Sequence, residues 1–333
     1  MITMSQVARE AGLSRYTVSK ILNGDKSVKE SSREAVLALC ERLGYMPDDN
    51  AVGLVKGRTN IIAMLVPYIT DGFYSEIIEL VESFAESAGF RLIYKSSYNN
   101  AAKEAEVIKS FLALKACAMI VVPVVDNPGW RIHELAAKRI PLVYLDRVMW
   151  KGCRCVLNDN EASGEAMTSH LLSRTKRVAY LGSFYGSANP TAAARQRGYL
   201  KAVAASGATP LLIPVDSSAE RQDNEAFGHA NMAAALKGGA KFKAVFCVTD
   251  SVALGACKAI REFGLEPGKD MLVAGHDNLR FSAYSAPSIT TMAQPKAQLA
   301  EACFEMASKL AQGKPVRKKA RLFKSELIVR ESA

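Results

Sequence analysis

The stretch QVAREAGLSRYTVSKILN, residues 6–23, reads as two short helices joined by a tight turn. Its apolar residues recur at spacings of three and four, which gives each helix one apolar face. Gly12 supplies the backbone freedom that a sharp turn needs, and Leu13 fills the angle between the helices. The pattern predicts a helix-turn-helix.

The polar residues of the second predicted helix share a chemistry that suits DNA. They donate hydrogen bonds or carry positive charge, as side chains that read bases in the major groove must. They are Arg15, Tyr16, Thr17, Ser19 and Lys20. An ordinary three-helix microdomain with a solvated polar face would show the same pattern, so the flanking sequence matters.

The flanking sequence favours a small helical domain. Thr3 and Gln6 have the spacing of a capping box, in which each side chain satisfies a free amide at the helix start. A third helix is predicted near Ser31, with Val36, Leu39 and Leu43 on one face. It ends at Gly44, and Pro47 prevents its continuation.

Several short runs carry a resemblance to a known family. They are Val7-Ala8, Ala11-Gly12-Leu13-Ser14, Thr17-Val18-Ser19, Leu22-Asn23 and Leu43-Gly44-Tyr45. Together they resemble the headpiece of the lactose/galactose repressor family of bacterial transcriptional regulators. Near the other end of the chain, the run ELIVRES at residues 326–332 is similar to the closing strand of that family.

Composition limits the class of protein. The chain has 333 residues, 49% of them hydrophobic and 23% charged, which suits two or three globular domains. It has no apolar run long enough to span a membrane and no apparent signal segment, so we expect a cytoplasmic protein.

Seven scattered cysteines suggest reduced thiols. The close pair Cys153 and Cys155 lacks a second ligand cluster, so a strand edge with buried thiols is favoured over a zinc site, and we expect no metal or cofactor.

The net charge of +10 favours a polyanionic partner. Residues 1–60 hold nine Lys or Arg against seven Asp or Glu, so the position of the charges matters more than their sum there. Residues 314–330 hold seven Lys or Arg against Glu326 alone. This basic stretch could assist the approach of DNA or could simply be a solvated face.

From Ile61 onward, continuous apolar strands alternate with helices, which predicts parallel sheets covered on both faces. Strands are predicted at 61–67, 90–94, 118–125, 141–145, 177–182, 211–215, 244–248 and 271–275. Helices are predicted at 74–88, 101–115, 130–138, 160–173, 192–206, 222–237 and 251–263. The fold class is therefore a small all-α headpiece followed by two α/β lobes in tandem.

The resemblance makes these lobes doubly wound parallel sheets of the periplasmic-binding-protein type. It implies a headpiece at 1–47, a hinge helix and linker at 48–60, and a core for effector binding and dimerisation at 61–333. The first lobe would hold 61–157 and 288–320, and the second 158–287 and 321–333. Crossovers would lie near Leu157, between Pro287 and Thr291, and near Arg321.

The resemblance also assigns DNA contacts. Base contacts fall on Arg15, Tyr16 and Lys20; the last position is commonly arginine, and lysine lacks the fork that reads guanine with two bonds. Candidates for phosphate contacts are Thr3, Ser5, Ser14, Thr17, Ser19, Asn23 and Lys29. Simple solvation of the helix surface is an alternative for Thr17 and Ser19.

Residues 50–56 match the family hinge more loosely. Leu54 agrees with the leucine that wedges into the minor groove, whereas Val52 stands where arginine is usual. So short a helix is marginal alone, and Gly53 weakens it further, which is consistent with folding on DNA. The alternative is that Leu54 is a core leucine. Two headpieces in a homodimer would bind an inverted-repeat operator.

Polar residues follow the predicted strands at the ends where open α/β folds bind ligands. They are Thr70, Asp71, Phe73, Tyr74, Asp146, Arg147, Thr249, Asp250 and Asp277, and Arg195 joins them near the start of the predicted helix 192–206. Carboxylates and guanidinium groups suit sugar hydroxyls, and aromatic rings can stack on a sugar or a base. These positions match ligand contacts in the family, although Thr249 replaces a common asparagine. Each could instead cap a helix or form an interlobe ion pair.

Two other classes of protein are weighed. An enzyme is disfavoured, because the phosphate-loop-like run at 264–270 has the wrong spacing and ends in Asp270, and the four histidines accompany no nucleophile motif. A solute-binding transport protein is disfavoured by the headpiece and by the lack of a signal segment. We therefore expect a dimeric repressor switched by a small effector. A sugar or sugar phosphate is favoured, with a purine or nucleoside as the alternative.

Overall fold

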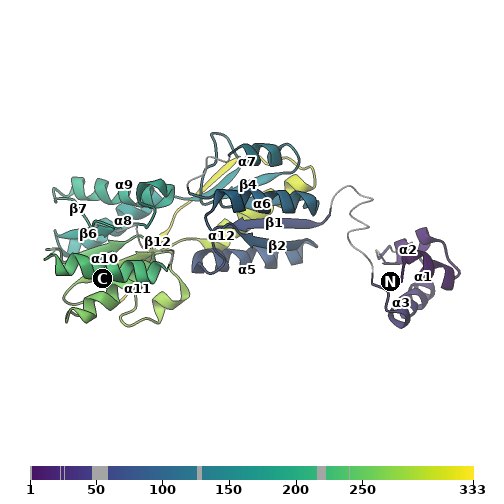
Figure 1. Ribbon diagram of the computed structural model, residues 1–333, viewed down its shortest axis with the longest axis horizontal. Helices are drawn as coiled ribbons and strands as arrows, with labels where there is room; N and C mark the ends of the chain where they lie inside the picture. Colours follow the sequence, from purple (N-terminus) through teal and green to yellow (C-terminus); the bar gives the residue numbers. More distant parts are fainter. Residues whose placement is uncertain are drawn as a thin grey trace. The chain divides into compact units, whose positions relative to one another are not determined.

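The computed structural model describes residues 2–22, 24–25, 27–46, 59–125, 130–215, 223–239 and 241–333. The chain divides into two compact units, Met1–Thr59 and Asn60–Ala333. The smaller unit contains the predicted headpiece. The larger unit is an α/β core, drawn in Figure 1 as two lobes.

The headpiece has three helices, α1 (Met4–Glu10), α2 (Arg15–Leu22) and α3 (Glu30–Leu43). The capping box between Thr3 and Gln6 is confirmed, as is the end of α3 at Gly44, which has a left-handed conformation. Gly12 has a φ of +64° in the turn between α1 and α2. The three apolar faces meet in one small core made of Val7, Ala8, Val18, Ile21, Val36, Leu39 and Cys40. The sequence pattern therefore predicted this unit correctly.

The first lobe is built on a parallel sheet with the strand order β11-β5-β4-β3-β1-β2. Alternate residues of β1 pack into two clusters, so the sheet is covered on both faces: Ile62 packs with α5 and α12, and Ala63 packs with α6. The strands are β1 (Ile61–Val66), β2 (Arg91–Ser96), β3 (Ala118–Val121), β4 (Leu142–Leu145), β5 (Cys155–Asn158) and β11 (Ala320–Phe323). The helices are α5 (Gly72–Ser87), α6 (Ala101–Ala113), α7 (Trp130–Ala137) and α12 (Lys296–Ala311).

The second lobe repeats this plan with the order β12-β10-β9-β8-β6-β7, except that β12 runs antiparallel to β10. Its strands are β6 (Val178–Leu181), β7 (Leu211–Leu212), β8 (Ala244–Cys247), β9 (Leu272–His276), β10 (Thr290–Ala293) and β12 (Glu326–Ile328). Its helices are α8 (Asn160–Arg174), α9 (Pro190–Ala205), α10 (Asn224–Lys237) and α11 (Asp250–Glu262), with short 3₁₀ turns at Gly186–Ala188 and Arg280–Ala283.

Two of the three expected crossovers were placed wrongly. The chain passes between lobes after β5 as expected, but the return lies between Ala293 and Lys296, and the last passage lies between Phe323 and Glu326. Strand β10 belongs to the second sheet because it pairs with β9 and β12, so residues 288–293 are not part of the first lobe. Strand β11 belongs to the first sheet because it pairs with β5. The yellow carboxyl-terminal segments accordingly appear in both lobes of Figure 1.

The cysteine pair lies where the chain enters β5, and both thiols are buried. Within the described residues, no group of three or more His, Cys, Asp or Glu side chains is arranged to hold a metal ion. No helix in the described part of the chain is long and apolar enough to cross a membrane.

Candidate ligand cleft and DNA-binding face

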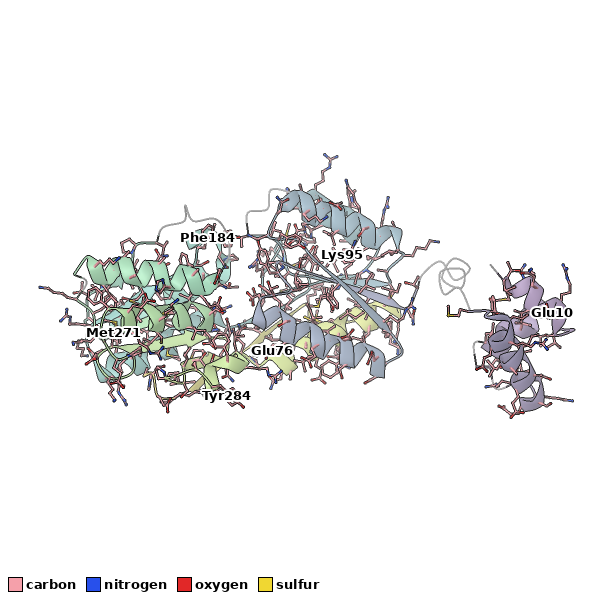
Figure 2. The ribbon with its side chains drawn as sticks, turned by 60° about the horizontal axis from the view of Figure 1, so that its bottom comes forward. Glu10, Glu76, Lys95, Phe184, Met271 and Tyr284 are labelled. Carbon is pink, nitrogen blue, oxygen red and sulfur yellow. The ribbon has the colours of Figure 1, made fainter. Side chains whose placement is uncertain are left out.

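A cavity of about 180 Å³ is lined by residues of both lobes. It lies at the carboxyl ends of the strands, where open parallel sheets bind ligands. The first lobe contributes Tyr68, Thr70, Asp71, Phe73, Asp146 and Arg147. The second contributes Ser183, Phe184, Tyr185, Asn189, Arg195, Glu225, Thr249, Ser251 and Asp277. Figure 2 labels Phe184 at the end of the second lobe nearest the first.

Arg195 and Asp277 form the most constrained pair of the cleft. Arg195 lies on α9 and Asp277 follows β9, and both side chains are buried. The Arg195 guanidinium donates to Asp277 Oδ1 (3.3 Å), to Asn160 Oδ1 (2.9 Å) and to the Val248 carbonyl (2.6 Å). Three acceptors on different elements therefore fix the plane of this guanidinium.

Close helix packing sets the position of Arg195. A Cβ atom at Gly164 on α8 would lie 2.2 Å from the Arg195 carbonyl oxygen, and one at Gly198 on α9 would lie 2.1 Å from the Glu161 carbonyl oxygen. Only glycine at both positions lets the two backbones approach this closely. The packing of α8 on α9 thus brings Arg195 within reach of Asn160 and Asp277.

Asp277 is held in its ionised form by its neighbours. Its Oδ1 also accepts from Gln294 Nε2 (2.7 Å) and from His276 Nδ1 (2.8 Å). Burial opposes ionisation, but Arg195, His276 and Gln294 outweigh it and keep the pKa of Asp277 below its usual value. Every one of these bonds ends on Oδ1, which leaves Oδ2 for a ligand.

His276 supports Asp277 as a neutral ring. Burial lowers the pKa of His276 to about 4, and the nearby Arg195 adds to the effect. The single ring proton belongs on Nδ1, because that nitrogen faces the Asp277 carboxylate. The other ring nitrogen, Nε2, is buried and has no hydrogen-bond partner among the residues that the structure describes.

The first lobe presents a second acid–base pair, Asp146 and Arg147, directly after β4. Arg147 Nε lies 3.7 Å from Asp146 Oδ2, too far for a hydrogen bond, and this nitrogen has no other partner within the described part of the chain. The Arg147 guanidinium also donates to the Pro123 carbonyl. Tyr74 donates its hydroxyl to Asp146 Oδ2 (3.1 Å). This pair is less tightly held than the pair in the second lobe.

Asp71 and Thr249 cap helices and line the cleft at the same time. Asp71 accepts from the Phe73 amide (2.9 Å) at the start of α5, and Thr249 accepts from the Val252 amide (3.3 Å) at the start of α11. Burial and the Asp277 carboxylate raise the pKa of Asp71 to about 6. The sequence left open whether these two residues cap helices or line the cleft, and the structure shows that they do both.

The structure places Asp250 behind the cavity wall, which corrects the expectation that it faces the ligand. It is fully buried, and its carboxylate accepts from the Leu279 amide (2.8 Å), Ser282 Oγ (2.6 Å) and Thr291 Oγ1 (2.6 Å). These bonds tie α11 to the segment after β9 and to β10. Asp250 supports the wall from inside the second lobe.

Sequence reasoning missed several cavity residues, of which Gln294 is the most informative. Its side chain is buried beside the cavity, its Nε2 donates to Asp277, and its buried Oε1 has no partner among the described residues. Gln294 lies in the crossover between β10 and α12, which the expected lobe boundaries concealed. Glu225 was also missed, because it follows a loop at the start of α10 rather than a strand.

In the headpiece, two of the expected phosphate-contact residues cap helices. Thr3 caps α1, and the Ser14 hydroxyl accepts from the Thr17 amide (3.1 Å) at the start of α2. Arg15 and Tyr16 are exposed at the same end of α2, with 71% of Tyr16 accessible. Ser5 and Lys29 are exposed, whereas Thr17, Ser19 and Lys20 are partly buried. Asn23 and the hinge with Leu54 lie outside the described residues.

Comparison with known proteins decides the family. Residues 3–48 match the model of bacterial regulatory proteins of the lacI family, and residues 62–315 match a periplasmic binding protein domain. This chain belongs to the lacI family of bacterial regulatory proteins. It is therefore a DNA-binding transcriptional regulator that responds to a ligand.

Individual relatives agree with this assignment. The HTH-type transcriptional regulator GalR of Escherichia coli is 30% identical over all of this chain and 96% of its own length. The HTH-type transcriptional repressor PurR of Erwinia tasmaniensis is 31% identical over 92% of this chain and 89% of its own length. The Lac repressor dimer bound to operator superposes with a TM-score of 0.87 at 24% identity, covering 99% of this chain and 98% of that one, which shows the fold.

Proposed function

We propose that this regulator is a homodimeric repressor that binds an inverted-repeat operator and changes its operator affinity when a small, uncharged sugar occupies the cleft. Such a protein acts in the cytoplasm, where the DNA is. The arrangement of Arg195, Asp277 and Gln294 carries the proposal. It places a fixed guanidinium and a carboxylate, whose Oδ1 is held by three donors, on one side of a small cavity.

The chemistry of this arrangement suits adjacent hydroxyl groups. A sugar hydroxyl both donates and accepts, so it can donate to Asp277 Oδ2 while it accepts from a guanidinium. Tyr68, Phe73, Phe184 and Tyr185 add aromatic surface to the same cavity. A cavity of about 180 Å³ has room for a ligand of monosaccharide size.

The charge of the lining favours an uncharged sugar over a sugar phosphate. Among the described lining residues there are four carboxylates, those of Asp71, Asp146, Glu225 and Asp277, and two guanidinium groups, those of Arg147 and Arg195. Both guanidinium groups already face a carboxylate. A phosphate would add negative charge to a cleft that has an excess of it.

The 264–270 run adds no support for an enzyme. A phosphate loop leads into the start of a helix, whereas this run follows the end of α11 and leads into β9. We propose that the cleft binds its ligand without turnover. Recovery of an unchanged sugar after prolonged incubation tests that part of the proposal.

The whole proposal is tested by selecting DNA fragments from the source genome with the full-length chain, at a fixed salt concentration of about 150 mM. We expect an inverted repeat upstream of genes for carbohydrate use.

The ligand assignment is tested by calorimetry. A sugar suggested by those genes, its phosphate and a purine base are titrated into the wild type and into the Asp277→Asn variant, and their affinities are compared. Binding of the purine alone, or tighter binding of the phosphate, would overturn the ligand assignment. Recovery of unrelated fragments would overturn the operator assignment.

A further inference from the structure

Lys20, one of the residues expected to face bases, is held in place by three neighbours in the headpiece. Its Nζ lies 3.4 Å from Asp25 Oδ2 and donates to Ser27 Oγ (3.2 Å). The same Nζ lies 5.3 Å from the centroid of the Tyr16 ring, within range of a cation–π contact. Tyr16 is itself expected to face bases, so the two side chains are joined on one surface of α2.

Asp25 is fixed by the turn that follows α2. Its amide donates to the Lys20 carbonyl (3.0 Å), and its own carbonyl accepts from Arg33 Nη2 on α3 (2.7 Å). One carboxylate oxygen, Oδ1, accepts from the Ser27 amide (2.8 Å). The other oxygen, Oδ2, is the one that faces Lys20. The carboxylate therefore has a defined direction before any DNA arrives.

This arrangement compensates for the weakness of lysine as a base reader. Lysine is a point charge on a flexible stem, whereas arginine presents a rigid fork. Partners that limit the positions of the Lys20 ammonium restore part of that directionality. A carboxylate close to the DNA-facing surface also opposes phosphate binding that is independent of sequence.

We infer that Asp25 is a positioning residue for DNA recognition, which directs Lys20 across the Tyr16 ring and thereby sets operator specificity. The inference rests on the DNA-binding role of the headpiece. It requires no contact between Asp25 and DNA. It predicts that loss of the Asp25 charge reduces the preference for operator over random DNA, and not merely the overall affinity.

The test compares Asp25→Asn with Glu10→Gln in the full-length chain. The asparagine side chain of the first variant can still accept from the Ser27 amide, so the turn is kept while the negative charge is lost. Glu10 pairs with Arg42 at 3.8 Å elsewhere in the headpiece, so Glu10→Gln makes the same change of charge away from Lys20. Each variant is titrated with the duplex that the wild type selects from a randomised library and with random duplex, at several salt concentrations.

For Asp25→Asn we expect the ratio of operator to random affinity to fall about fivefold or more, with a salt slope on random DNA steeper by up to about one. For Glu10→Gln we expect the ratio to be unchanged. Equal ratios in the two variants would overturn the inference. Thermal unfolding of both variants checks that the headpiece remains folded.

A double variant separates positioning from a general structural effect. If Asp25 acts through Lys20, then adding Asp25→Asn to a Lys20→Met variant should not change the ratio of operator to random affinity any further. The same loss in both backgrounds would contradict the inference. A wild type that selects no sequence at all would overturn both this inference and the proposed operator binding. Selection by the wild type with no effect of Asp25→Asn would overturn this inference alone.

Discussion

In both lobes of the core, the third strand of the sheet is followed by an aspartate in the same kind of backbone conformation. The two lobes differ in how firmly they hold that side chain. Strand β4 is third in the first sheet and β9 is third in the second, and each is followed by an aspartate with positive φ, +67° at Asp146 and +111° at Asp277. Such backbone conformations are costly for aspartate and concentrate at functional sites. The repeated geometry directs a carboxylate from each lobe into one cavity.

The arginine partners distinguish the lobes. Asp146 faces its neighbour in sequence, Arg147, at 3.7 Å, whereas Asp277 faces Arg195, which is 82 residues away in the chain, at 3.3 Å. Arg195 has three acceptors and Asp277 has three donors. We therefore propose that the second lobe is preorganised to anchor the ligand and that the first lobe supplies the less constrained wall.

Removal of the two arginines should show the largest difference between the lobes. Arg195→Met leaves Asp277 buried without its counter-ion and leaves two further acceptors unpaired, so we expect a loss of about 3–5 kcal/mol in the free energy of unfolding. Arg147→Met should cost about 1–2 kcal/mol. Urea unfolding of both variants measures these values. Equal losses would contradict the distinction between anchor and wall.

The stability contributed by Asp71 in the first lobe and by Asp277 in the second should depend on pH in opposite directions. The pKa of Asp71 is about 6 in the folded chain and near 3.8 when unfolded, so unfolding releases a proton between these values. The contribution of Asp71 to stability therefore falls as pH rises from about 4 to 6. Asp71→Asn keeps the helix cap and should gain about 2–3 kcal/mol over the wild type between pH 4 and 7.

Asp277 provides the matched comparison. Its folded pKa is lowered, so its contribution is present above the unfolded pKa of 3.8 and is lost as pH falls through the folded value. Asp277→Asn should therefore flatten the acid limb below pH 4, and it should also weaken the trend between pH 4 and 6, because the Asp277 carboxylate helps to raise the pKa of Asp71. Unfolding curves for both variants at one-unit intervals of pH check these directions. Parallel curves for Asp71→Asn and the wild type from pH 4 to 7 would refute the assignment for Asp71.

Two glycines should sharpen the comparison with a smaller effect. A methyl group at Gly164 meets the backbone of Arg195, which cannot yield without moving a helix, so Gly164→Ala should cost about 1–3 kcal/mol and weaken ligand binding. A methyl group at Gly72 in the first lobe meets only the end of the Leu279 side chain, at 3.2 Å. Gly72→Ala should stay within about 0.5 kcal/mol of the wild type. A ligand affinity of Gly164→Ala equal to that of the wild type would show that α8 and α9 do not need this close contact to place Arg195.

Much of the fold could be predicted because its signals are local. The capping box at Thr3, the left-handed end of α3 at Gly44 and the continuous apolar strand β1 depend on residues close together in sequence. The later crossovers could not be predicted, since the apolar pattern did not reveal β10 or β11 as strands, and β11 pairs with β5, which lies far earlier in the chain.

The residues of the site likewise fall into those with a local signal in the sequence and those without one. Residues that follow strands, such as Asp146 and Asp277, could be predicted to line the cleft from their position and from the family resemblance, and both line the cavity. Gln294 follows a strand that the pattern did not reveal, and the burial of Asp250 depends on hydroxyl groups 32 and 41 residues away. The sequence near Asp250 carries no signal of its burial, and the sequence near Gln294 carries no signal of its contact with Asp277.

The most direct test of the account is the operator affinity of the full-length chain with and without a saturating sugar that calorimetry has shown to bind, at one salt concentration. We predict that the sugar changes the operator affinity of the wild type by about fivefold or more. We predict no change for Asp277→Asn, with a sugar-free operator affinity equal to that of the wild type. A sugar that binds the cleft and leaves the operator affinity of the wild type unchanged would contradict the account.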